Sequence, residues 1–144
     1  MNATAPRPSR DRAVGWQAGL SRLSAGLLAY LLLTGLPVRL LPFSPLVEWS
    51  LLFHAAVGLA AMAPLSLYLW RHWKAYRPDA LTPSKVIGYM SLVAVAAAAG
   101  TGLWVTALAF FSDRVPSSVR ILHLVPSVAL AVFAVAHLVP SWRR

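Results

Sequence analysis

Four long apolar runs, separated by short polar segments that are rich in proline, dominate the pattern of the sequence. Each run approaches or exceeds the roughly 20 residues that a helix needs to cross the hydrocarbon core of a bilayer. The runs cover about residues 20–38, 46–72, 85–111 and 118–140. Residues 1–17 are polar, basic and contain proline, so we expect a disordered cytoplasmic tail there. The pattern predicts a single membrane domain over residues 18–144.

The connections between the runs are short, and this decides how the predicted helices are arranged. Helices joined by short loops pack as antiparallel neighbours. We therefore predict an all-α fold, an integral membrane four-helix up-down-up-down bundle. Pro64 and Pro126 lie inside predicted helices and are expected to kink them. We recognise no convincing internal repeat.

The composition supports lipid as the main solvent of this chain. Of its 144 residues, 58% are hydrophobic and only 12% are charged, whereas soluble domains carry about 25% charged residues. The chain contains no cysteine. Disulfides, thiolate metal sites, iron–sulfur clusters and covalently attached c-type haem are therefore excluded.

The formal net charge of +9 could suggest nucleic-acid binding, but the basic residues flank the apolar runs, as topology signals do. Ten of them lie on the side of the N-terminus, the middle loop and the C-terminus, and three lie on the opposite side. The positive-inside rule then places both termini in the cytoplasm of a multi-pass protein, which we expect in a bacterial inner membrane. The three are Arg39, Arg114 and Arg120. No nucleic-acid partner is expected.

The chain has four histidines, two on the second predicted helix and two on the fourth. His54 and His72 are 72 − 54 = 18 residues apart, about five helical turns. His123 and His137 are 137 − 123 = 14 residues apart, close to four turns. Each helix therefore presents two imidazoles on one face, about 27 Å and about 21 Å apart along the axis. Helix tilt or a kink at Pro64 would have to absorb part of the difference.

These histidines form two pairs at matched depths, because the second and fourth helices run in the same direction. His54 and His123 lie towards the outer leaflet, while His72 and His137 lie at the inner boundary. Two imidazoles that face each other across a helical bundle are a common way to hold the iron of a b-type haem. The pattern predicts two b-type haems, one above the other, and hence an electron path through the membrane.

Other interpretations of the same histidines stay open. His72 follows Arg71 at a membrane boundary and could be only an interfacial polar residue. A proton relay through the membrane is less well supported, because no Asp or Glu lies near the middle of a predicted helix.

Glycines and one arginine are further candidates for cofactor contacts. Gly88 and Gly102 are 102 − 88 = 14 residues apart, the spacing of the histidines on the fourth helix. They and Gly58 could let a flat macrocycle approach the backbone, or they could serve ordinary packing between helices. Arg120 precedes His123 by about one turn on the outer side and could pair with a haem propionate.

Four helices with paired histidines on the second and fourth, and the spacing His-x13-His, resemble the dihaem cytochrome b subunits of membrane-bound formate dehydrogenases and hydrogenases. The resemblance covers the membrane domain and rests on short motifs. It implies that His54 and His123 ligate an outer haem and that His137 ligates an inner one. In the formate dehydrogenase type the second inner ligand comes from the first helix, where this chain has no histidine. Either His72 replaces it or the inner haem is absent.

The resemblance implies an electron-transferring subunit of an oxidoreductase complex in a respiratory chain, without a catalytic site of its own. Its expected partners are membrane lipid, a periplasmic redox subunit or c-type cytochrome, and a quinone. A stand-alone quinol-linked cytochrome of the bacterial b561 type would share the haem chemistry without the partner subunit. A haem-free transporter component or assembly factor is the alternative from another class, although polar residues that would line a midplane cavity are scarce.

Overall fold

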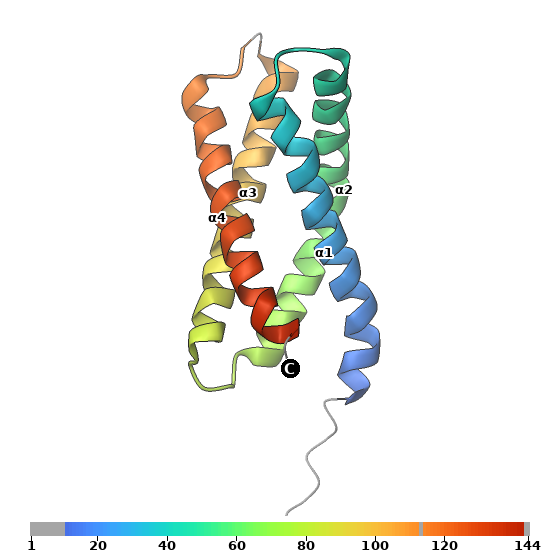
Figure 1. Cartoon of the computed structure of the whole chain (residues 1–144), viewed down its shortest axis with the longest axis vertical. Coiled ribbons are helices and arrows are strands. Elements are labelled where there is room, and N and C mark those ends of the chain that lie inside the picture. The colour runs from blue at the N-terminus through green and yellow to red at the C-terminus, as the bar shows by residue number, and fades with distance from the viewer. Residues whose placement is uncertain (1–10, 113, 143–144) are drawn as a thin grey trace, which may run out of the picture.

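The computed structural model describes residues 11–112 and 114–142, and it describes the side chains of residues 19–112 and 114–137. Four helices follow one another up and down the molecule (Figure 1). They are α1 (Asp11–Leu40), α2 (Pro45–Tyr76), α3 (Pro83–Phe111) and α4 (Ser117–Trp142). The predicted all-α four-helix bundle is confirmed.

The loops set the start of α2 and α3 by the same local chemistry. Ser44 and Thr82 are in extended conformation and cap the two helices, and a proline follows each cap. Their hydroxyl oxygens accept hydrogen bonds from the backbone N–H of Val47 at 3.5 Å and of Lys85 at 3.3 Å. Such caps satisfy backbone donors that the first helical turn leaves without partners. Proline at the first helical position loses nothing, because its missing N–H would be unpaired there.

The first helix is longer than its apolar run. It begins at Asp11, whereas the hydropathy pattern places its start near residue 20. Residues 11–17 therefore belong to α1 and not to the predicted tail, of which residues 1–10 lie outside the described residues. No proline occurs between residues 11 and 36, so helical hydrogen bonding continues past the end of the apolar run.

All four helices are long and apolar enough to cross a membrane. The qualifying segments are Gly19–Leu40, Pro45–Tyr76, Pro83–Phe111 and Ser117–His137. Large apolar side chains cover the outside of the bundle, and Leu33 and Val93 are 67% and 66% exposed. A surface of this kind suits contact with lipid, as expected of a multi-pass membrane protein.

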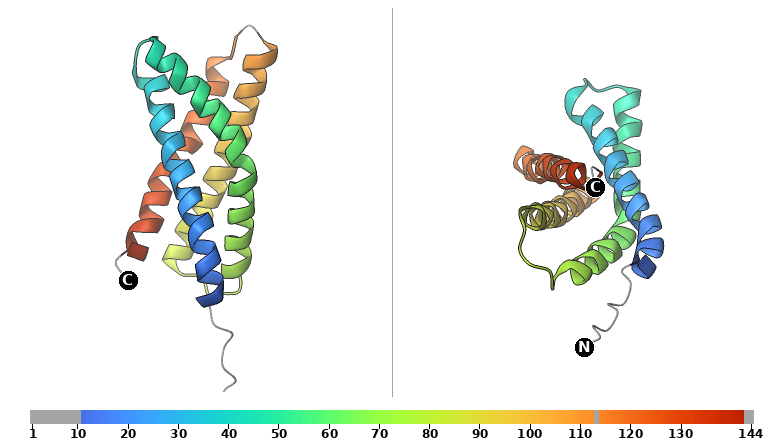
Figure 2. Two further views of the ribbon diagram at one scale, coloured as in Figure 1. Left: turned by 90° about the vertical axis from the view of Figure 1, so that its right-hand side faces the viewer. Right: turned by 60° about the horizontal axis from the view of Figure 1, so that its bottom comes forward.

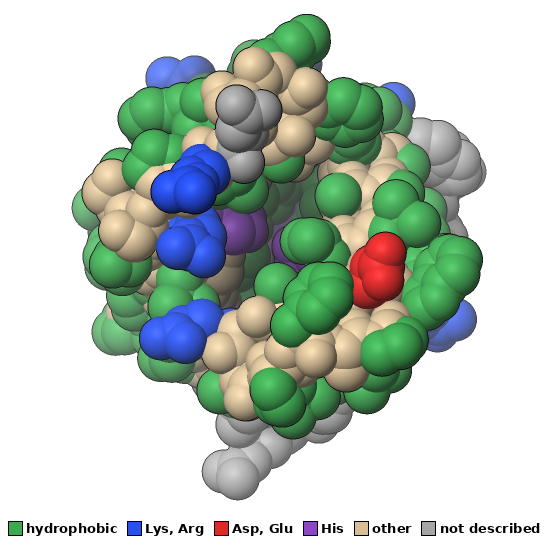
Figure 3. Space-filling model, turned by 90° about the horizontal axis from the view of Figure 1, so that it is seen from above, with side chains coloured by type: hydrophobic (Ala, Val, Ile, Leu, Met, Phe, Trp, Pro, Cys, Tyr) green, Lys and Arg blue, Asp and Glu red, His purple; other side chains and the backbone are tan. Residues whose placement is uncertain are grey.

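The helices form two hairpins, in which α1 packs along α2 and α3 packs along α4 (Figures 1 and 2). Contacts between the hairpins are far fewer and are made mainly by α2 and α3. Only a few of the described side chains are buried, among them Ala61, Leu65, Ala94 and Val95. Seen from the end that carries the α1–α2 and α3–α4 loops, the bundle has a hollowed centre with histidine side chains in its wall (Figure 3). We call this space the central hollow.

The second helix is not straight. It changes direction about halfway along its length (Figure 2), and Pro64 lies inside it. Proline removes one helical hydrogen bond and its ring clashes with the preceding turn, which bends a helix. The bend lies between His54 and His72, where the sequence requires α2 to cover more residues than α4 over the same depth.

Candidate histidine centres

The structure brings the four histidines together as two pairs across the central hollow. The outer pair, near the α1–α2 and α3–α4 loops, consists of His54 from α2 and His123 from α4. Its ring centroids are 6.2 Å apart and its ring planes meet at 75°. The inner pair, near the α2–α3 loop, consists of His72 and His137, with centroids 6.3 Å apart and planes at 85°. Both pairs join the residues that the helical spacing matched.

A cradle on α1 holds the ring of His54. The Nδ1 atom lies 2.9 Å from the carbonyl oxygen of Leu31 and 3.2 Å from Oγ1 of Thr34. Because a carbonyl oxygen only accepts, Nδ1 must carry the hydrogen and donate it. The hydrogen-bond pattern therefore assigns the tautomer in which Nε2 keeps a free lone pair, as a metal ligand requires.

The rings of α4 are held in the same way by α3. Nδ1 of His123 lies 3.1 Å from the carbonyl oxygen of Ala98 and 3.3 Å from Oγ1 of Thr101. Nδ1 of His137 lies 3.2 Å from the carbonyl oxygen of Ser84. Three of the four imidazoles therefore donate from Nδ1 to the backbone of the other helix in their own hairpin. Each of the three is left with Nε2 as its available ligand atom.

A glycine lies directly beside each of these three rings. A Cβ atom added at any of the glycines would lie 3.1 Å from the Cε1 atom of the imidazole, which is tighter than ordinary packing. The contacts join Gly35 with His54, Gly102 with His123, and Gly88 with His137. Gly88 and Gly102 were predicted to admit a macrocycle, but they adjoin the imidazoles instead. Without a side chain, each lets a ring come close enough to reach the carbonyl four residues earlier.

The other two residues predicted to contact a cofactor have less specific surroundings. Gly58 faces α1, where an added Cβ would meet Cδ2 of Leu31 at 3.7 Å, an ordinary packing distance. Its role is therefore helix packing within the first hairpin. Arg120 is exposed in the first turn of α4, one turn before His123.

Sequence reasoning missed the α1 half of the outer site and the threonines on both sides. Thr34 and Gly35 in α1 correspond to Thr101 and Gly102 in α3, and the tripeptide Thr-Gly-Leu occurs at both places. The two hairpins therefore carry an internal repeat that the sequence analysis did not recognise. The repeated tripeptide was the available signal, but three shared residues among so many apolar ones do not stand out.

The surroundings of His72 differ from those of the other three histidines. Its ring lies beside the rings of Tyr68 and Tyr76, with centroids 5.4 Å and 4.7 Å away. Within residues 19–112 and 114–137, its nitrogens make no hydrogen bond. Its ring is only half-buried and opposes His137 across the hollow. This position supports a role in the inner pair more than a purely interfacial one.

The spacing of both pairs fits two imidazoles on one metal. Bonds from metal ions to imidazole nitrogens are about 2 Å long. Since a ring nitrogen lies about 1 Å from the centre of its ring, two such ligands on opposite sides of a metal have centroids about 6 Å apart. The observed 6.2 Å and 6.3 Å match this value.

No family model, curated protein or solved structure matches this chain. Its chemistry is therefore argued from the two pairs themselves. Among the described residues, no group of three or more His, Cys, Asp or Glu side chains gathers in one place. A bare zinc ion usually takes four ligands, of which three or four come from the protein. A haem supplies four nitrogens of its own and needs only the two that each pair offers.

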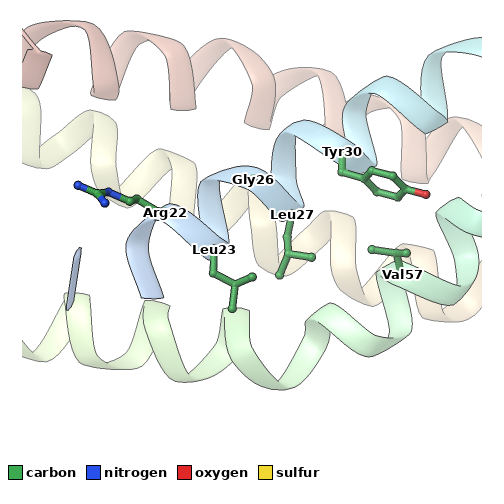
Figure 4. A pocket seen from close by; sticks show the side chains of 6 residues that line it. All are labelled: Arg22, Leu23, Gly26, Leu27, Tyr30 and Val57. Carbon is green, nitrogen blue, oxygen red and sulfur yellow. The ribbon is translucent and has the colours of Figure 1, made fainter. Parts of the chain in front are cut away.

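A separate groove of about 660 Å³ lies on the α1–α2 hairpin (Figure 4). Its walls are apolar, and the side chains of Arg22 and Tyr30 stand towards its two ends. The residues that line it are Arg22, Leu23, Gly26, Leu27, Tyr30 and Val57. None of the histidines lines this groove.

Proposed function

We propose that this chain is a b-type cytochrome that carries electrons through a membrane by way of two haems. The observation that carries the proposal is the pair of opposed imidazoles at each of two depths, with centroids 6.2 Å and 6.3 Å apart. His54 and His123 would hold the outer haem, and His72 and His137 the inner one. A bound haem supplies one-electron chemistry, which no side chain in this apolar bundle provides.

The residues of the chain would do three things for the haems. The four imidazoles supply the axial ligands, and the cradles on α1 and α3 fix the orientation of three of them. The apolar helices keep water from the central hollow. The stacking of the two sites along the bundle gives electrons a route from one membrane face towards the other.

We further propose that electrons pass between a periplasmic redox partner and the quinone pool of a bacterial inner membrane. The resemblance to cytochrome b subunits of formate dehydrogenases and hydrogenases supports this part. A stand-alone b561-type cytochrome would bind the same haems without a partner subunit. Purification from native membranes in mild detergent separates the two, since a redox subunit should copurify stoichiometrically only in the first case.

The first expected result is the haem content. Purified protein should contain two haems per chain in a pyridine haemochrome assay, with the spectrum of low-spin iron after dithionite reduction. Each site offers two nitrogen ligands at the required spacing, which is the physical reason. One haem per chain would reject the inner site. Protein without haem, even when haem is supplied during synthesis, would reject the cytochrome and favour a transporter component or assembly factor.

The second expected result is the orientation in the membrane. Ten basic residues against three place the N-terminus, the α2–α3 loop and the C-terminus in the cytoplasm. Alkaline phosphatase fused after Arg144 should be inactive, and the same reporter inserted in the α1–α2 loop should be active. The reverse pattern would exchange the assignment of the two pairs to the membrane faces while leaving the pairs themselves intact.

A further inference from the structure

The outer and inner pairs differ in the groups that hold their imidazoles. Both outer imidazoles donate from Nδ1 into a cradle that contains a carbonyl oxygen and a threonine hydroxyl. In the inner pair, Nδ1 of His137 reaches only the carbonyl of Ser84, and Ile87 occupies the position that threonine has in the other cradles. His72 is flanked by tyrosine rings instead. The threonine is therefore a feature of the outer site alone.

The two threonines have nearly the same geometry. Oγ1 of Thr34 lies 2.8 Å from the carbonyl oxygen of Tyr30, 3.3 Å from that of Leu31 and 3.2 Å from Nδ1 of His54. The corresponding distances for Thr101 are 2.7 Å to the carbonyl of Ala97, 3.2 Å to that of Ala98 and 3.3 Å to Nδ1 of His123. The same side chain thus does the same thing in each hairpin.

The direction of these hydrogen bonds follows from the donors available. A threonine hydroxyl has one hydrogen, and the shortest contact is to the carbonyl four residues earlier, so the hydroxyl donates there. An oxygen lone pair is then left for the imidazole. The Nδ1–H group consequently faces two acceptors, the backbone carbonyl and the threonine oxygen. Acceptors on this side of a ligating imidazole increase the basicity of its other nitrogen.

We propose that Thr34 and Thr101 are positioning residues that lower the reduction potential of the outer haem and leave that of the inner haem unchanged. The inference rests on the proposed function, since it requires a haem between His54 and His123. A more basic axial ligand favours the oxidised iron, which carries the greater positive charge, over the reduced iron. Because the threonines act through the two imidazoles from opposite hairpins, each contributes separately.

The test is a spectroscopic redox titration of the purified protein and its variants. Thr34→Val and Thr101→Val keep the branched shape of the side chain and remove the oxygen. Each should raise the potential of one component only, by a roughly tenfold change in the reduction equilibrium, which is about 59 mV for one electron. The same component should move in both variants, and further in the double variant.

A matched control is available one turn further along α3. Oγ1 of Thr106 also donates to a carbonyl four residues earlier, that of Gly102, at 2.9 Å. Thr106→Val removes the same kind of hydrogen bond from the same helix, so both potentials should stay as in the wild type. Thr34→Ser and Thr101→Ser keep the hydroxyl and should also leave both potentials in place.

The outcomes separate this inference from the proposed function. Wild-type protein without haem would reject the proposed function, and the inference with it. Two haems whose potentials do not move in the valine variants, or move together, would reject the inference alone. If the valine variants lose the outer haem, the serine variants decide. Retention with serine supports a role for the hydroxyl, whereas loss with serine as well means that threonine only fills space.

Discussion

Replacing His54 or His123 by alanine should remove the outer haem and leave the inner one, so that the haem content falls from two per chain to one. The reason is that a six-coordinate low-spin iron needs both imidazoles, and the two rings face each other with centroids 6.2 Å apart. The two variants should therefore give the same absorption spectrum and the same single potential. Pyridine haemochrome content and a redox titration measure both quantities.

The inner pair provides the complementary test. His72→Ala and His137→Ala should both remove the other haem, because their rings oppose each other at 6.3 Å. A wild-type spectrum for His72→Ala would mean that His72 is an interfacial residue and that another group ligates the inner iron. The pairing itself would be wrong if His54→Ala and His123→Ala affected different haems.

The second large effect is expected from a glycine and not from a ligand. Gly102→Val should abolish binding of the outer haem, since even a Cβ at this position would lie 3.1 Å from Cε1 of His123. Overpacking of this kind costs about 1–3 kcal/mol when the surroundings must shift. Here the ring has to move, and it would lose its hydrogen bonds to Ala98 and Thr101 as it does so. Gly35→Val should have the same effect from the other hairpin.

The same helix offers a control for this substitution. Gly100 is exposed, and a Cβ added there meets nothing within 4 Å. Gly100→Val therefore tests the general effect of valine in α3, and we expect it to keep both haems. Loss of the outer haem from both variants would mean that α3 tolerates no valine in this turn, and that the contact between Gly102 and His123 is not the cause. Haem content and membrane expression are measured for both.

The sequence by itself determined the spans, their order and the face on which each histidine lies. Lipid makes this possible, because a spanning segment must satisfy its backbone hydrogen bonds internally and must be apolar, so hydropathy and helix coincide. The histidine spacings are multiples of the helical repeat, and short loops make successive helices antiparallel. From these facts alone, His54 could be matched with His123 and His72 with His137. The start of α1 was less certain, because a helix can continue in water where no proline stops it.

Only the tertiary structure decided what holds the imidazoles. The cradles join residues of different helices, such as Leu31 with His54 and Ala98 with His123, and their acceptors are backbone carbonyls, which every residue possesses. Nothing in the sequence marks which carbonyl will be used. The importance of Gly35 likewise depends on how closely α1 packs along α2. The opposition of His72 and His137, despite their different spacing from the outer pair, required the bend of α2 near Pro64, whose size and direction depend on packing rather than on the proline alone.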